Sequence, residues 1–202
     1  MNLLAHAFLS FNEPGVLVGN MISDFVKGSK KFDYPAAIQK GISLHRSIDQ
    51  FTDFHPATIM AKQYFRPVYR LYSGAFIDIV YDHFLATDNS QFKSDQALQE
   101  FAQNTYVQLS AFNDIFPRNF KLLLPFMSLH NWLYNYQFRS GIRKSFEGMV
   151  RRAKYLEESD IAFSIFEKNY DELEACYLDF FPSLKEFAFK ELQLLNNQEQ
   201  LL

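Results

Sequence analysis

Histidine and aspartate side chains gather in the first part of the chain, where their mixture could bind a metal ion. Four of the five histidines lie within the first 83 residues. His45 and Asp49 are spaced i,i+4, as are Asp78 and Asp82, so the members of each pair project from one helix face. Imidazole with carboxylate suits a catalytic divalent cation such as Mn²⁺, Fe²⁺ or Zn²⁺. A metal ion held this way can activate water and clamp a phosphoryl oxygen.

The surroundings of these groups favour a metal site over ordinary ion pairs. A single histidine–aspartate pair is common on helix surfaces, but these carboxylates interrupt apolar helices, where a charge is costly unless it is paired or bound to a metal. Histidines and aspartates that merely pair in the core remain the alternative. Three other residues are expected to be structural: His55 before Pro56 caps or closes a turn, His130 has a structural role, and Cys176 is a small buried hydrophobe.

The composition excludes several classes of protein. The 202 residues are 48% apolar and 17% aromatic, which indicates a filled core rather than disorder. The net charge of −3 argues against general nucleic-acid binding. The chain has no glycine-rich phosphate loop and no GxSxG motif, so metal-activated water is favoured over a nucleophilic side chain. Without a signal-like start or a long apolar stretch, we expect a soluble, cytoplasmic protein with no membrane partner.

The elements that must position these groups are predicted to be helices only. Apolar residues recur at steps of three and four, and nothing alternates at period two. The pattern predicts an all-α, single-domain helical bundle over residues 1–202. The expected helices are 3–11, 16–26, 35–51, 57–71 (kinked at Pro67), 74–86, 95–112, one opened by Pro117, one or two over 129–155, 160–181 ended by Pro182, and 184–195.

Several ordered motifs resemble those of a known family. They are Asn2-Leu3-Leu4-Ala5-His6, the run from Gly19 to Gly28, the run from Gly41 to Asp49, Phe51-Thr52-Asp53-Phe54-His55-Pro56, and the run from Asp78 to Leu85. Together they resemble the acyl carrier protein phosphodiesterase family. The resemblance implies an all-α, divalent-metal hydrolase that removes the 4′-phosphopantetheine arm from holo-acyl carrier protein. It also implies an HD-like phosphohydrolase architecture in distorted or permuted form, because the His-Asp dipeptide of HD enzymes reads Asp82-His83 here.

The resemblance also implies roles for particular residues. The expected metal ligands are His6, Asp24, His45, Asp82 and His83. Asp49 and Asp78 would orient the imidazoles, or one of them would be a further ligand. Arg46 and Lys27 would neutralise the phosphodiester oxygens, although Lys27 is equally well explained as a solvated residue. The expected cofactor is Mn²⁺, with Mg²⁺ or Fe²⁺ as alternatives.

A basic stretch in the second half could hold the partner, since a carrier protein is small and acidic. Between residues 139 and 154, six cations face a single acid, Glu147; they are Arg139, Arg143, Lys144, Arg151, Arg152 and Lys154. Such a patch would steer and orient an acidic partner, and an ordinary solvated helix face is the alternative. Two other functions remain open: hydrolysis of nucleotides or other small phosphodiesters at the same site, and a non-enzymatic helical interaction protein. The oligomeric state is open.

Overall fold

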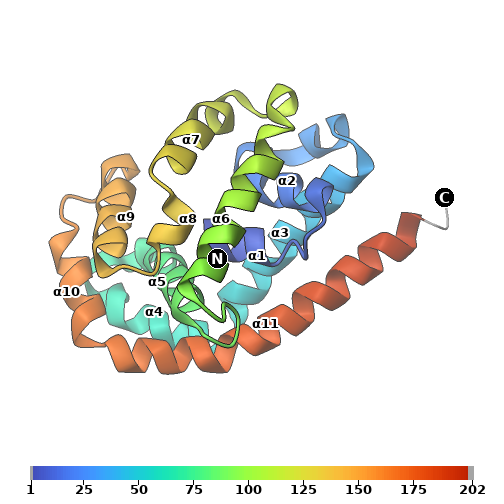
Figure 1. The fold of residues 1–202 in the computed structure, drawn as a ribbon. Helices are drawn as coiled ribbons and strands as arrows, with labels where there is room; N and C mark the ends of the chain where they lie inside the picture. Colours follow the sequence, from blue (N-terminus) through green and yellow to red (C-terminus); the bar gives the residue numbers. More distant parts are fainter. Residues whose placement is uncertain (1, 200–202) are drawn as a thin grey trace.

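The computed structural model describes residues 2–199, and within that range the chain forms helices joined by loops, with no strand (Figure 1). The predicted all-α class is therefore confirmed. The α-helices are α1 (Leu3–Phe8), α2 (Pro14–Ile22), α3 (Ala36–Phe54), α4 (Pro56–Tyr69), α5 (Ser73–Thr87), α6 (Asp95–Ser110), α7 (Arg118–Leu129), α8 (Trp132–Asn135), α9 (Arg139–Arg152), α10 (Asp160–Lys168) and α11 (Tyr170–Glu199). Short 3₁₀ helices are η1 (Ser23–Phe25), η2 (Gly28–Asp33), η3 (Arg70–Tyr72) and η4 (Asn113–Ile115).

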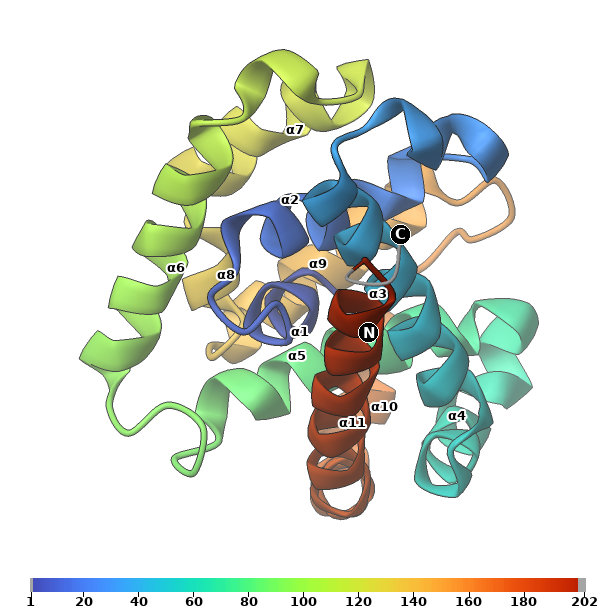
Figure 2. The ribbon, with the colours of Figure 1, turned by 90° about the vertical axis from the view of Figure 1, so that its right-hand side faces the viewer.

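The N-terminal helices lie in the middle of the bundle. Figure 2 shows α1 and α2 between α6, α7 and α8 on one side and α3 and α4 on the other. The buried apolar side chains form one core cluster that draws on both halves of the chain, from Leu4 and Ile42 to Phe166 and Leu184. The central position of α1 and α2 means that polar groups on them are shielded from water, where their interactions are strong.

Two glycines allow α2 and α3 to cross with their backbones in contact. A Cβ atom on Gly19 would lie 2.1 Å from the carbonyl oxygen of Ile38, and one on Gly41 would lie 2.2 Å from that of Val16. Neither position can hold a side chain, because no atom tolerates so short a separation. The close crossing brings the backbone of Asn20, next to Gly19, within reach of His45, one helical turn after Gly41.

Two helix boundaries predicted in the second half of the chain are wrong. The helix expected over 160–181 is interrupted at Asn169, whose side-chain amide donates to the carbonyl oxygen of Ile165 and so ends α10. Pro182 does not end the following helix, because α11 runs through it to Glu199. Pro182 and Leu178, whose carbonyl loses its helical partner, are both exposed to water. The neighbouring Phe181 and Leu184 are buried, so packing holds the helix on both sides of the proline.

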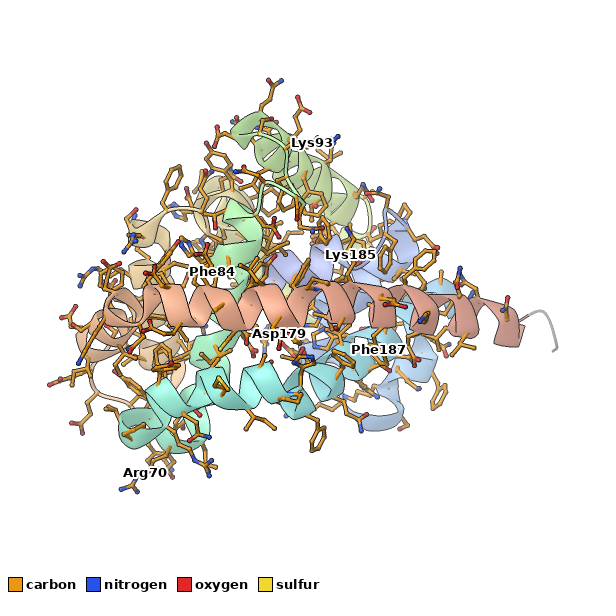
Figure 3. The ribbon with its side chains drawn as sticks, turned by 90° about the horizontal axis from the view of Figure 1, so that it is seen from below. Arg70, Phe84, Lys93, Asp179, Lys185 and Phe187 are labelled. Atoms are coloured by element: carbon orange, nitrogen blue, oxygen red, sulfur yellow. The ribbon has the colours of Figure 1, made fainter. Side chains whose placement is uncertain are left out.

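Helix α11 packs along one side of the bundle. It packs against α3 and α4, and in Figure 3 Lys185 and Phe187 leave it on opposite sides. Lys185 donates to Gln91 at 2.7 Å, and the ring of Phe187 stacks on that of Phe51 in α3 with centroids 4.6 Å apart. This packing fixes α3, which carries part of the site described below.

The remaining predictions concern two further helix boundaries, membrane spans and the domain organisation. The stretch 129–155 holds two helices beyond the end of α7, namely α8 and α9. The first helix was expected to reach Phe11 but ends at Phe8, and Phe11 and Asn12 adopt positive φ, which a helix does not allow. Within the described part of the chain, no helix is both long and apolar enough to cross a membrane. The single domain over 1–202, of which residues 1 and 200–202 lie outside the described range, and the HD-like arrangement stay predictions.

Candidate metal centre

Two histidines and one aspartate converge from two helices. His6 lies in the last turn of α1, and His45 and Asp49 share one face of α3. The Nε2 atom of His6 is 3.2 Å from Oδ1 of Asp49, and the Nε2 atom of His45 is 3.1 Å from Oδ2 of the same carboxylate. The two imidazole rings stack with centroids 3.8 Å apart. Both nitrogens therefore point at one carboxylate, and the three residues could hold a metal ion together.

Asp24 joins the same site from η1. Its Oδ1 atom lies 3.2 Å from Nε2 of His45. The two imidazoles are buried, with side chains 4% and 6% exposed, whereas the Asp49 side chain is 41% exposed and that of Asp24 is 77% exposed. The cluster therefore opens to solvent through its carboxylates, and a ligand can approach from that side only.

Asn20 on α2 fixes the orientation of both imidazoles. Its side-chain NH₂ donates to the backbone carbonyl of His6 at 2.8 Å and to Oγ of Ser10 at 3.2 Å, so its Oδ1 atom must be the one that faces Nδ1 of His6, at 2.8 Å. The backbone carbonyl of Asn20 faces Nδ1 of His45 at 2.7 Å. Both partners are acceptors, so both Nδ1 atoms carry a hydrogen. In the neutral rings, Nε2 is then a bare lone pair, as in histidines that bind metals.

The resulting arrangement needs a cation. Two Nε2 lone pairs and the Asp49 carboxylate are all acceptors, and they face one another at 3.1–3.2 Å. The buried Nε2 atom of His6 has no hydrogen-bond donor opposite it. An unpaired buried acceptor such as this Nε2 atom is costly, and a metal ion bound between the three acceptors would stabilise them. This donor set fits a divalent metal ion.

The proton affinities of the four groups follow from this geometry. Burial, together with the charge of His45, lowers the pKa of His6 to about 4. Burial also opposes protonation of His45, but the hydrogen bonds and charges of Asp24 and Asp49 outweigh it and raise its pKa to about 9. Burial acts to raise the pKa of Asp49, yet its contacts with the two imidazoles hold it far below its usual range. The hydrogen bond to His45 lowers the pKa of Asp24. Without metal, His45 therefore carries a proton at neutral pH, which places a positive charge beside Asp24 and Asp49.

Two of the expected ligands lie elsewhere. Asp82 is fully buried on α5 and accepts hydrogen bonds from the backbone N–H groups of Leu4, at 2.7 Å, and Ala5, at 3.1 Å. Both of its oxygens are thereby occupied at the start of α1, where no backbone acceptor exists for these N–H groups. Burial raises the pKa of Asp82 to about 7, although these two hydrogen bonds act to lower it. In this structure Asp82 positions the helix that carries His6 instead of joining His6, His45 and Asp49.

His83, next to Asp82 on α5, has different partners. Its Nδ1 atom faces the carbonyl oxygen of Tyr136 at 2.7 Å, and its Nε2 atom faces the hydroxyl of Tyr170 at 2.9 Å. Burial lowers its pKa. Both ring nitrogens are used in tying α5 to the segment after α8 and to α11, so the structure does not bring His83 to the metal ligands.

Three other expected catalytic residues lie on α3, just after η1 and on α5. Arg46 is exposed on α3 next to His45, and its Nη2 atom donates to the carbonyl oxygen of Val26 at 2.9 Å. Lys27 is exposed just after η1. Asp78 is half-buried on α5, and burial raises its pKa. The roles expected of all three stay predictions.

The six cations of the basic stretch separate into three groups. Arg139 pairs with Glu167 and stacks over Tyr170, and Arg143 pairs with Asp160. Lys154, just beyond α9, lies over the ring of Tyr155. The remaining three, which are Lys144, Arg151 and Arg152, line a cavity beside α8. The patch is therefore less free to meet an acidic partner than the sequence suggests, and docking there stays a prediction.

The minor histidines and the cysteine behave largely as expected. His55 is the N-cap of α4, where its Nδ1 atom accepts from the backbone N–H of Ala57 at 3.3 Å. Cys176 is buried. His130 is exposed at the end of α7 and lines the same cavity as Trp132. Asn20 was not predicted to act in the site. The feature that could have indicated it is a polar amide, here fully buried, within an otherwise apolar helix.

Known proteins resemble the chain over almost its whole length. The sequence model for acyl carrier protein phosphodiesterases matches residues 1–184. Proteins named acyl carrier protein phosphodiesterase are similar to it: one from Photorhabdus laumondii is 32% identical over 188 residues (93% of this chain, 95% of that protein). One from Yersinia pestis is 33% identical over 184 residues (91% and 95%), and one from Escherichia coli is 31% identical over 191 residues (95% and 99%). No solved structure matches the chain. The chain belongs to the acyl carrier protein phosphodiesterase family.

Proposed function

We propose that the protein hydrolyses the phosphodiester between 4′-phosphopantetheine and the serine of holo-acyl carrier protein, using a divalent metal held by His6, His45 and Asp49. The observation that carries the proposal is the convergence of two imidazole lone pairs and one carboxylate at 3.1–3.2 Å, in a cluster that opens to solvent. In the reaction, water adds to phosphorus, the bond from phosphorus to the serine oxygen breaks, and the serine oxygen leaves with a proton. The name of the family supports this substrate over nucleotides.

The metal we propose is Mn²⁺. Two imidazole nitrogens and carboxylate oxygens suit Mn²⁺ or Fe²⁺ better than Mg²⁺, which prefers oxygen ligands alone. A divalent cation supplies Lewis acidity: it polarises a phosphoryl oxygen and makes water a nucleophile near neutral pH. Asp24, which already contacts His45, is the proposed fourth ligand.

The residues around the ligands prepare the site before substrate arrives. Asn20 keeps a hydrogen on both Nδ1 atoms and so directs both lone pairs inward. Arg46 is held against the Val26 carbonyl, and its remaining N–H groups can bind the negative phosphodiester oxygens. The carboxylates form the exposed side of the site, where the phosphodiester of a protein substrate can reach without entering a deep cleft. A cytoplasmic location, where a carrier protein would be met, is part of the proposal.

Mass spectrometry of holo-acyl carrier protein tests the function. Incubation with the protein and Mn²⁺ should remove the mass of the phosphopantetheine group, and chelation of the metal should prevent this. A panel of nucleotides and small phosphodiesters, assayed in parallel, should turn over more slowly. Turnover of nucleotides with intact holo-carrier protein would support the alternative substrate class. No turnover and no bound metal would favour the non-enzymatic alternative.

A further inference from the structure

A polar cavity whose lining includes none of the proposed metal ligands lies between α9, α8 and the start of α1. It has a volume of about 510 Å³. Its walls include the indole of Trp132, the buried Tyr136 and Ile79 of α5, and it is edged by the amide side chains of Asn2 and Asn135. The cavity thus combines an aromatic and apolar wall with hydrogen-bonding groups, which is typical of a site for a small organic molecule.

Three cations line this cavity. Lys144, Arg151 and Arg152 contribute positive charge, and Glu147 is the one acid in the lining. In the described part of the chain no carboxylate forms an ion pair with any of the three cations. Arg139 and Arg143 on the same helix differ, since each pairs with an acid. The lining therefore carries a net charge of about +2, from three cations and one acid, and no ion pair among the described residues neutralises it.

Both guanidinium groups converge over Gly148. A Cβ atom on Gly148 would lie 3.4 Å from Nη1 of Arg152 and 3.7 Å from Nη2 of Arg151, and no backbone atom of another element would come closer. Packing therefore does not require glycine at this position, although glycine inside a helix is less stable than alanine. Gly141 on the same helix is different, because its Cβ would lie 2.0 Å from the carbonyl oxygen of Asn135. The missing side chain of Gly148 lets the guanidinium groups of both arginines lie close to the helix backbone at this point.

We propose that this cavity binds a small organic phosphate monoester, with the phosphate between Arg151 and Arg152 above Gly148 and the organic part against Trp132. A phosphate monoester carries a charge of about −1.5 to −2 at neutral pH, which matches the charge of the lining. Guanidinium groups bind phosphate through paired N–H donors, which gives both strength and direction. A single carboxylate would neutralise only half of the charge, and an uncharged molecule would leave both arginines unused.

The site is independent of the metal centre and survives if the proposed reaction is wrong. If that reaction is right, its product, 4′-phosphopantetheine, belongs to the chemical class that the cavity fits. A free nucleoside monophosphate belongs to the same class. The two sources differ in the part that lies against Trp132, which is a flexible amide chain in one and a planar ring in the other.

Trp132 allows a direct test, because it is the one tryptophan in the chain. We would titrate the full-length protein in excess chelator, so that no metal can bind phosphate, and follow tryptophan fluorescence. The probes are 4′-phosphopantetheine and AMP, with pantetheine and adenosine as their phosphate-free counterparts. We expect a saturable change with at least one phosphate-bearing probe, and at least tenfold weaker binding of its phosphate-free counterpart. The tighter of the two phosphate probes identifies the source.

Matched variants locate the binding. R151Q/R152Q should weaken the phosphate probe at least tenfold, and Gly148→Leu, which fills the space without removing charge, should do the same. R143Q is the control, since it removes a paired arginine from the same helix and should leave affinity unchanged. Circular dichroism checks that each variant is folded. A response that is absent, that is equal with and without phosphate, or that R143Q reduces as much as R151Q/R152Q would overturn the proposal.

Discussion

Replacing Asn20 by alanine should weaken metal binding without removing a metal ligand. The side chain of Asn20 takes part in three buried hydrogen bonds, to Nδ1 of His6, to the His6 carbonyl and to Oγ of Ser10. Each bond contributes about 1 kcal/mol, so N20A should lower the free energy of unfolding of the metal-free protein by about 3 kcal/mol. The buried Nδ1–H of His6 also loses its acceptor, and nothing then favours a lone pair on Nε2.

The effect on the metal should be separable from the effect on the fold. Loss of a group that orients a ligating histidine reduces metal affinity by about 10- to 100-fold. Titration calorimetry with Mn²⁺ on folded N20A measures this directly, and the rise in melting temperature on adding Mn²⁺ should shrink in parallel. Ser10→Ala is the matched control: it removes Oγ, which donates to the His6 carbonyl and accepts from Asn20, but keeps the contact between Asn20 and Nδ1. S10A should bind Mn²⁺ almost as the unaltered protein does. An N20A protein that is folded and binds Mn²⁺ with unchanged affinity would refute the reasoning.

Four further predictions follow from the same structure. The pKa of His45 is raised to about 9, so Mn²⁺ must displace the proton from its ring. Titrations should therefore show that the affinity for Mn²⁺ rises about tenfold between about pH 7 and pH 8. An affinity for Mn²⁺ that does not change with pH would contradict this prediction. For the metal-free protein, the stability contributed by this raised pKa should be present below about pH 6.5 and be lost as the pH rises through about 9, which urea unfolding at several pH values measures. Asp82→Ala leaves two buried N–H groups of α1 without acceptors. The substitution should therefore lower the free energy of unfolding, measured with urea, by about 2–6 kcal/mol. If it lowered only the affinity for metal, Asp82 would be a metal ligand instead. Charge reversal in Lys144→Glu/Arg151→Glu should raise KM for carrier protein, more at low salt than at high salt, without changing turnover of a small phosphodiester; an unchanged KM would exclude docking there.

The fold class and part of the metal centre could be predicted from the sequence, because both depend on local patterns. The helical period placed most helices, and the i,i+4 spacing placed His45 and Asp49 on one face of α3. The resemblance added His6 and Asp24, which the structure brings to that pair. Asp49 was expected to orient the imidazoles or to be a further ligand, and its contacts with both Nε2 atoms favour the second role.

The remaining features depend on contacts between distant residues. Asp82 and His83 are adjacent in sequence but face different neighbours around α5, and only the fold shows that one holds the start of α1 and the other contacts Tyr136 and Tyr170. The partners of Arg139 and Arg143 lie 28 and 17 residues away, so the sequence alone overstates the free charge of α9. Pro182 is tolerated within α11 because of packing on both sides, which a local rule for proline does not include.

Anomalous diffraction from a crystal soaked with Mn²⁺ would locate the metal ion. We expect one strong peak bounded by Nε2 of His6, Nε2 of His45 and a carboxylate oxygen of Asp49, with Asp24 at its open side. This peak should disappear in a crystal of Asp49→Asn soaked in the same way. A peak beside Asp82 or His83, or no peak near the stacked imidazoles, would show that these three residues do not hold the metal.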